Sequence, residues 1–283
     1  MKRLLTCGLL VASTGLAVCT LEAKFHKAVL KEKGKRGNPF RNLYPKRVNR
    51  FFRQFFDDTY DIGANIFRET TLKIITATIP FYLVARQFDN KIHNFFYDAQ
   101  THTNKHQPPS WLVDVGYKYL PVPMVLFGSL GFLDDDPYIR RRSRIFAVGT
   151  AWAFVLKYIC KDLIKTDATL RPLNGNFDKN KRVHGGSPSG HMAMLAYFST
   201  FWSLEFKSWW VVPLTAYSFL GASMCIAANK HYLSQTIVGS GIGIVLGFGA
   251  HALVDSLKLP ESLSCAITSN PNGALGVSLA YDF

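Results

Sequence analysis

The sequence predicts an all-α protein, a helical bundle of about six core helices. Its apolar stretches are longer than ordinary strands, their Leu, Ala, Ile, Phe and Val residues follow no strict alternation, and polar loops separate them. A bundle of packed helices is the architecture that buries such segments. In order along the chain, the predicted helices are Ile74–Ala85, Tyr119–Leu133, Ile145–Leu156, Met192–Leu204, Ser208–Asn229 and Tyr232–Val254.

The lengths of these helices divide them into two groups. The first four run 12 to 15 residues before a charged side chain intervenes, which is typical of buried core helices. Ser208–Asn229 and Tyr232–Val254 contain no Asp, Glu, Lys or Arg over 22 and 23 residues, the length that a bilayer demands. Because the mean hydropathy of the chain is only +0.06, we favour a bundle that is soluble or lies against a membrane. A bundle that crosses the membrane is the alternative.

The N-terminal region is predicted to consist of two parts. Residues 1–23 begin with Met1-Lys2-Arg3 and continue with an apolar run, and we interpret them as a signal peptide, with a retained N-terminal anchor as the alternative. Residues 24–72 form a basic N-terminal arm, in which residues 24–54 hold eleven Lys or Arg and one acid. The arm accounts for much of the net charge of +14.

An anionic membrane surface is the partner that this arm favours. A nucleic-acid partner is not predicted, because no nucleic-acid-binding module and no pattern of stacking aromatic residues follows the arm. The sequence gives no indication of the oligomeric state.

The helical domain is predicted to span residues 73–258, and residues 259–283 form a C-terminal tail. Large apolar residues alternate with small or polar ones over residues 273–283, which predicts a β-strand and is also typical of the ends of outer-membrane proteins. Together with the signal peptide and the short helices, this tail suggests the bacterial cell envelope, either the periplasm or the membrane. The cysteines outside the signal peptide are three and widely spaced, so neither a disulfide framework nor a metal site is predicted: Cys160, Cys225 and Cys265.

Three short motifs at the edges of the predicted helices indicate a phosphate-binding site. They are Arg171-Pro172, Pro188-Ser189-Gly190-His191 and Lys230-His231-Tyr232. A histidine that attacks phosphorus, a second histidine that protonates the leaving oxygen, and an arginine with backbone N–H groups are what a metal-free phosphatase needs. The glycine-rich segment before His191 enters a predicted helix, whose N-terminal N–H groups form an anion cradle.

The order and placement of these motifs resemble the type 2 phosphatidic acid phosphatase superfamily, which also contains bacterial acid phosphatases and vanadium haloperoxidases. The resemblance covers roughly residues 74–257 and implies an all-α fold and hydrolysis without a cofactor. It implies that His231 is the nucleophile and His191 the general acid. By the same resemblance, the phosphate is bound by Arg171, Ser189 and Gly190.

The chain departs from the family pattern at three positions. Ile164 stands where the family has a lysine, and Lys165 is one residue closer to Arg171, so Lys165 serves only if the loop adjusts or its long side chain reaches around. Cys225 stands in place of an arginine. Gln235 replaces the aspartate that orients the nucleophile, and its carbonyl can accept the ring N–H without supplying negative charge.

Other cations are candidates to replace the missing charge, or are solvated surface groups: Lys179, Lys181, Arg182 and Lys230.

The retained and the missing motif residues lead to two hypotheses for the function. The leading hypothesis is a phosphatase that hydrolyses a phosphate monoester, or a pyrophosphate, of a lipid or lipid-linked substrate through a phosphohistidine. The alternative is a catalytically impaired protein of the same fold with a binding or structural role at the envelope. A vanadium haloperoxidase is disfavoured, because vanadate needs the cations that are missing.

Overall fold

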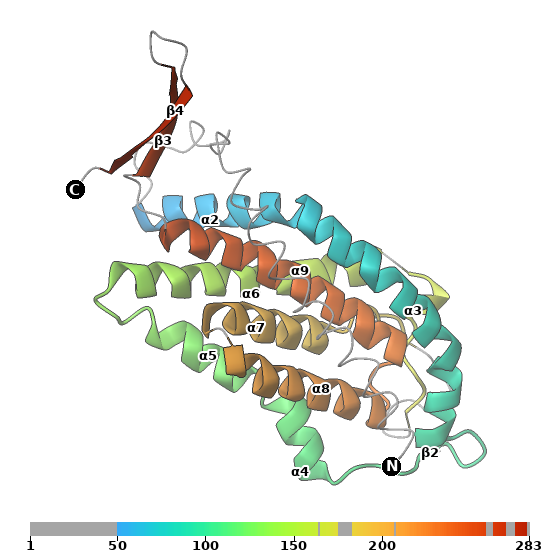
Figure 1. The fold of residues 1–283 in the computed structure, drawn as a ribbon. Helices are drawn as coiled ribbons and strands as arrows, with labels where there is room; N and C mark the ends of the chain where they lie inside the picture. Colours follow the sequence, from blue (N-terminus) through green and yellow to red (C-terminus); the bar gives the residue numbers. More distant parts are fainter. Residues whose placement is uncertain are drawn as a thin grey trace.

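The computed structural model describes residues 50–163, 165–174, 183–206, 208–258, 263–269 and 275–281, and it confirms the all-α fold class (Figure 1). Short π and 3-10 turns at Asp114–Lys118, Asp167–Thr169 and Ser208–Trp210 join some of the helices. The helices are α2 Arg50–Ile66, α3 Glu69–Phe96, α4 Ser110–Val113, α5 Pro121–Leu130, α6 Pro137–Leu163, α7 Gly190–Phe206, α8 Val211–Ala227 and α9 Leu233–Lys258. The strands are β1 Tyr97–Asp98, β2 Thr103–Asn104, β3 Leu263–Ser269 and β4 Leu275–Tyr281.

Helices α7 and α9 form the centre of the bundle, and α2, α3 and α6 pack on α9 (Figure 1). A glycine seam on α9, made of Gly239, Gly243 and Gly247, lets the two central backbones touch. A Cβ placed on Gly243 would lie 2.7 Å from the backbone nitrogen of Tyr197, closer than real Cβ atoms approach. The rest of the core combines aliphatic side chains with large aromatic ones such as Phe146, Phe201 and Trp202, all three nearly fully buried.

Helix α2 is a helix that the sequence analysis did not predict, because its segment was assigned to the basic arm. The structure buries part of it against α6 and α9. The guanidinium of Arg144 on α6 donates to the Asp58 carboxylate at 2.7 Å and to the Gln54 side-chain oxygen at 2.7 Å. Because the Asp58 carboxylate is paired with this guanidinium, it can be buried between the packed helices. The bundle therefore begins inside the predicted arm, while the arm before Arg50 lies outside the described residues, as does the signal peptide.

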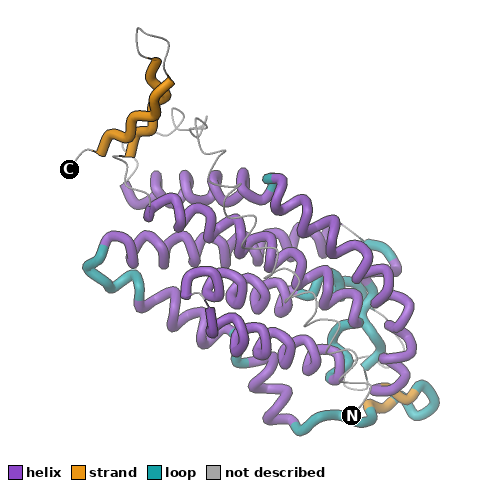
Figure 2. The backbone as a smooth tube through the Cα atoms, in the orientation of Figure 1, coloured by secondary structure: helices purple, strands orange, loops and turns teal. Residues whose placement is uncertain are grey.

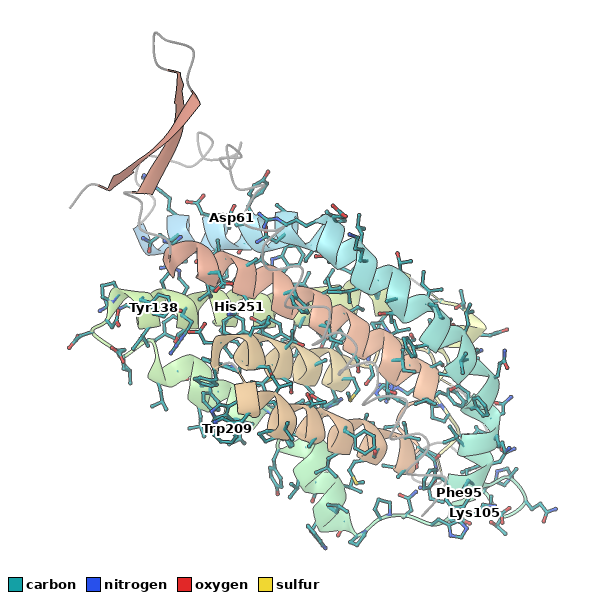
Figure 3. All side chains as sticks on the ribbon, in the orientation of Figure 1. Asp61, Phe95, Lys105, Tyr138, Trp209 and His251 are labelled. Atoms are coloured by element: carbon teal, nitrogen blue, oxygen red, sulfur yellow. The ribbon has the colours of Figure 1, made fainter. Side chains whose placement is uncertain are left out.

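At the end of α9 away from its first residue, a buried polar network joins three helices. Figure 3 shows His251 on α9 and Tyr138 on α6 toward this end, and Phe95 and Lys105 at the opposite end. The Tyr138 hydroxyl donates to Glu205 at 2.9 Å, and the His251 Nε2 lies 3.4 Å from the same carboxylate. The network ties α6, α7 and α9 together far from the candidate site.

Two helices in the described part of the chain are long and apolar enough to cross a membrane: Pro137–Lys161 in α6 and Leu233–Asp255 in α9. The second confirms the apolar stretch predicted at Tyr232–Val254. The prediction of bilayer length for Ser208–Asn229 is wrong for the helix itself, because α8 covers only Val211–Ala227, 17 residues. The apolar part of α9 is 67% buried in the bundle, whereas that of α6 is 39% buried.

Exposed apolar side chains run along several helices. On α3 they are Leu72, Ile75, Ile79 and Leu83; on α5, Val122, Val125, Leu126 and Leu130; on α6, Phe154, Val155, Tyr158 and Ile159. Exposed apolar side chains that form a contiguous patch are typical of surfaces that contact a partner or a membrane.

The tail forms a β-hairpin rather than a single strand (Figure 2). Strands β3 and β4 pair antiparallel, with Leu263 opposite Tyr281 and Ser269 opposite Leu275. Strand β4 confirms the alternation in the last eleven residues. The alternation of β3 is less regular in sequence, and its pairing with β4 was not predicted.

Candidate active site

The residues of the predicted phosphate site come together at the end of the bundle where α7 and α9 begin and α6 and α8 end (Figure 1). Three loops meet there, and we name them the Arg171 loop (165–174), the Gly186 loop (183–189) and the His231 loop (228–232). Backbone hydrogen bonds join the first two of these loops: Gly186 N donates to Thr169 O at 2.7 Å, and Arg171 N donates to Val183 O at 2.9 Å. Two helix N-termini at one place favour an anion.

His231 is buried, and its ring is held by a backbone carbonyl. The distance between its Nδ1 and Gly186 O is 2.7 Å. A carbonyl only accepts hydrogen bonds, so Nδ1 carries the proton and Nε2 carries the lone pair. Burial and the nearby Arg171 cation lower the pKa of His231 to about 3. At neutral pH the ring is therefore neutral and has a nucleophilic Nε2.

Gln235 does not make the contact predicted for it. Its amide nitrogen donates to Leu170 O at 2.7 Å and to Ala168 O at 3.2 Å, and its Oε1 accepts from Tyr232 N at 3.2 Å. The prediction that Gln235 orients the nucleophile directly is thus corrected, because Gly186 O occupies that role.

Gln235 does not reach His231 because its side-chain amide already makes hydrogen bonds with three backbone groups. Gln235 is 1% exposed, and a Cβ on Gly186 would lie 2.7 Å from its amide nitrogen and oxygen. Gln235 therefore packs beneath the residue that holds His231 and also ties the Arg171 loop to the start of α9.

His191 lies in the first turn of α7 and is partly buried. Burial, followed by the cations of Lys157, Lys161 and Arg171, lowers its pKa to about 4. An anion bound among these cations offsets their effect and raises this pKa, so a bound phosphate favours the protonated form that a general acid needs.

Arg171 and Ser189 bring buried polar atoms to the site without partners. The Nε of Arg171 and the Oγ of Ser189 are inaccessible and make no hydrogen bond within the described residues. Ser189 is fully buried, and its backbone N–H donates to Gln235 O at 3.2 Å. Buried groups of this kind are normally paired, so a bound anion would supply the partner that these two atoms lack.

Besides Arg171, the site has two cations that the sequence analysis did not name. Lys165 is exposed and follows the end of α6, whereas Lys157 and Lys161, on consecutive turns of α6, approach the histidines. A Cβ on Gly190 would lie 2.6 Å from Lys157 Cε, and one on Gly185 would lie 3.8 Å from Lys161 Cδ. The spacing of four residues on one helix is the signal that would have found them.

The other candidate cations have mixed outcomes. Lys230 is partly buried, and burial together with Arg171 lowers its pKa, so it lies near the site. Ile164, Lys179, Lys181 and Arg182 lie outside the described residues. Cys225 is 1% exposed, and burial raises the pKa of its thiol to about 12, so it is an unreactive core residue. No group of three His, Cys, Asp or Glu among the described residues is placed to hold a metal.

A layer of polar residues behind His231 was not found from the sequence. Asn229 in the His231 loop has a φ of 51°. Its side chain donates to Phe96 O at 2.9 Å and to Asn104 Oδ1 at 3.1 Å, and its Oδ1 lies 3.1 Å from His93 Nδ1. Asn174 joins the same layer by donating to Ala228 O at 2.8 Å.

Asp89 on α3 holds the first turn of α9 from the same side. Its carboxylate accepts from Ser234 N at 3.0 Å and from Ser234 Oγ at 2.5 Å. A carboxylate at this place satisfies a helix N–H that has no partner within the helix. Helix α3 and the β1–β2 hairpin therefore fix the His231 loop.

The family comparison agrees with the sequence prediction. The model of the PAP2 superfamily matches residues 143–258, a segment that contains α6 from Ser143, α7, α8 and α9. Neither the curated proteins nor the solved structures yield a match to the chain. The matched segment holds both histidines, Arg171 and the two lysines of α6, whereas α2 and α3 precede it.

Proposed function

We propose that this chain, whose residues 143–258 belong to the PAP2 superfamily, is a phosphatase that acts on a lipid or lipid-linked phosphate through a phosphohistidine on His231. Members of this superfamily are generally phosphatases, so the proposal concerns the substrate and the mechanism. The observation that carries the mechanism is the bond between His231 Nδ1 and Gly186 O, which leaves Nε2 as the free lone pair.

The first step of the proposed reaction is attack by His231 Nε2 on phosphorus. The N–P bond forms as the P–O bond to the leaving group breaks, and His191 gives its proton to the departing oxygen. Arg171, Ser189 Oγ and the N–H groups at the start of α7 are placed to stabilise the charge on the phosphoryl oxygens.

In the second step, water attacks the phosphohistidine. His191, now neutral, takes a proton from the water as the new P–O bond forms, and the N–P bond breaks to return neutral His231 and inorganic phosphate. The backbone carbonyl of Gly186 stabilises the ring N–H throughout, but brings less charge than the aspartate of a serine-protease triad. We expect slower turnover than in a site with a full carboxylate.

The lipid nature of the substrate rests on the surface of the protein. Exposed apolar side chains on α3, α5 and α6 and the basic arm favour an anionic membrane surface as the partner. We propose that the protein works at the membrane of a bacterial envelope, reached through the signal peptide predicted for residues 1–23.

A second candidate function is a binding or structural protein of the same fold. It is favoured by the residues at two motif positions, because Cys225 brings no guanidinium and Gln235 no carboxylate to the site. Such a protein would bind a phosphate ester without turnover.

Phosphate release from a panel of lipid phosphates and from a soluble aryl phosphate separates the two functions. We expect release by the wild-type protein that His231→Ala abolishes and His191→Ala reduces, with each variant shown to be folded by circular dichroism. Trapping of radiolabelled phosphate on His231 after acid-free quenching would support the covalent step. Tight binding of inorganic phosphate without any release would favour the binding protein.

A further inference from the structure

The second half of α6 combines features that suit the two parts of a lipid phosphate. Its outer face is apolar, with Phe154, Val155, Tyr158 and Ile159 exposed by 39%, 47%, 55% and 45%. These residues recur at the spacing of one helix face. Lys157 and Lys161 lie on the same turns, and both affect the charge of His191.

Lys157 connects the apolar face to the catalytic centre. Its side chain passes against Gly190, the residue before His191, where an added Cβ would lie 2.6 Å from its Cε. Its ammonium lies 4.8 Å from the centre of the Tyr158 ring and 5.7 Å from that of Phe154. These are cation–π distances, and within the described residues no carboxylate pairs with this ammonium.

From this arrangement we infer that the outer face of α6 is the binding subsite for the apolar part of the substrate, with Lys157 and Lys161 receiving its phosphate at the edge of the site. The inference rests on the proposed function and specifies its substrate as an amphiphile with an anionic phosphate and a hydrocarbon chain. The chain lies against Phe154, Val155, Tyr158 and Ile159, and the phosphate reaches His231 past Gly190.

Charge complementarity selects this face over the other exposed apolar faces. The exposed apolar side chains of α3 run from Leu72 to Phe88 and end beside Asp89, a carboxylate that holds the first turn of α9. On α6, by contrast, the apolar residues alternate with two cations that influence the catalytic histidine. A free phosphate needs only these cations, while a lipid phosphate uses both surfaces.

Ile159→Ser tests the apolar subsite, and Ile75→Ser on α3 is the matched control, because the two isoleucines are exposed by 45% and 43%. The substrates are dioctanoyl phosphatidate below its critical micelle concentration and a water-soluble aryl phosphate. We expect Ile159→Ser to lower kcat/KM for the lipid about tenfold, the scale of a few lost methylene contacts. The aryl phosphate should be hydrolysed as by the wild type, and Ile75→Ser should change neither rate.

Lys157→Met tests the other half of the inference, because methionine keeps an unbranched side chain without the charge. It should lower kcat/KM for both substrates by at least tenfold and weaken inhibition by inorganic phosphate, whereas Lys73→Met, at an exposed position near the start of α3, should do neither. Equal effects of the two lysine variants would overturn the role of Lys157.

The outcomes separate this inference from the proposed function. If the wild type hydrolyses neither substrate, the proposed function fails. If it hydrolyses both but Ile159→Ser matches Ile75→Ser, the subsite is refuted while the phosphatase stands. If Ile159→Ser impairs sedimentation with anionic phosphatidylglycerol vesicles and leaves hydrolysis of monomeric dioctanoyl phosphatidate unchanged, the face docks a membrane and the subsite is again refuted.

Discussion

Replacing Gln235 with the aspartate that the family pattern has at this position should damage the protein rather than improve it. The family pattern alone predicts the opposite, since an aspartate would orient His231 and stabilise its cation. In this structure, His231 Nδ1 is already bonded to Gly186 O, and the Gln235 amide nitrogen serves two carbonyls of the Arg171 loop.

The size of the loss follows from these contacts. Asp has no N–H to donate and is one methylene shorter, so Leu170 O and Ala168 O lose their donor beside a 1% exposed position. An unsatisfied buried carbonyl costs about 1–3 kcal/mol, so two carbonyls give a loss of roughly 3 kcal/mol or more. For a domain of this size, that loss lowers Tm by about 6–12 °C.

The pH dependence of this loss has a definite sign. Burial raises the pKa of the introduced carboxyl above that of an unfolded chain, and the protonated form can donate one hydrogen bond to a carbonyl. The folded variant therefore binds its proton more tightly than the unfolded one, so its deficit should shrink as pH falls through the raised pKa.

Thermal unfolding followed by circular dichroism and phosphate release from an aryl phosphate measure the two effects. We expect kcat/KM to fall about 10²-fold, because the Arg171 loop shifts. Gln235→Glu, which keeps the length and the acceptor for Tyr232 N, should lose stability for the same reason. An increase in kcat with an unchanged Tm in Gln235→Asp would show that the carboxylate reaches His231 and that the reasoning is wrong.

Three further predictions concern the histidines and the loops that hold them. The value of kcat/KM should rise as His231 loses its proton near pH 3 and fall as His191 loses its proton near pH 4. A stopped assay over a range of pH should therefore show a maximum of kcat/KM at acid pH. A maximum at alkaline pH would contradict these roles. Gly186→Ala should lower kcat/KM about 10²-fold, because its Cβ would lie 2.7 Å from the Gln235 amide and would displace the carbonyl that binds His231. Gly128→Ala is the control, since no atom would lie closer than 3.6 Å to its Cβ. Equal kcat/KM values for the two variants would refute the prediction. Asn229→Ala should lower the free energy of unfolding, measured in urea, by about 3 kcal/mol. Asn229→Gly should lower it by about 1 kcal/mol less, because glycine accepts a φ of 51°. Identical stabilities of the two variants would argue against backbone strain.

The fold was predictable from the sequence because it depends on long apolar segments. The stretches at Ile145–Leu156 and Met192–Leu204 lie inside α6 and α7, as expected. Helix α2 was missed because its segment is rich in charge. The partner that makes Asp58 tolerable is Arg144, 86 residues away, and such a pairing leaves no local signal.

The candidate site was predictable only where side chains form motifs. The segments around Arg171, Ser189 and His231 meet at one end of the bundle because helix edges carry them there. The partner of His231 is a backbone carbonyl, and every residue has one, so Gly186 gave no signal. The bond between Asn229 and Asn104 joins positions 125 residues apart, which only the folded chain brings together.

Lys157 shows a different reason for failure. The family motif directs attention to the residues just before Arg171, but α6 ends at Leu163. The cations that approach His191 come from earlier turns of the helix, whose position relative to α7 is set by packing.

The glycine seam of α9 has a mechanical consequence for a two-step reaction. His191 is in the first turn of α7 and His231 stands two residues before α9, so the seam at Gly239, Gly243 and Gly247 couples both histidines to one stiff pair of helices. Protein interiors packed at this density deform little. If the proposed two-step reaction takes place, the spacing between the two histidines should therefore be nearly the same when phosphate is transferred to His231 and when water attacks.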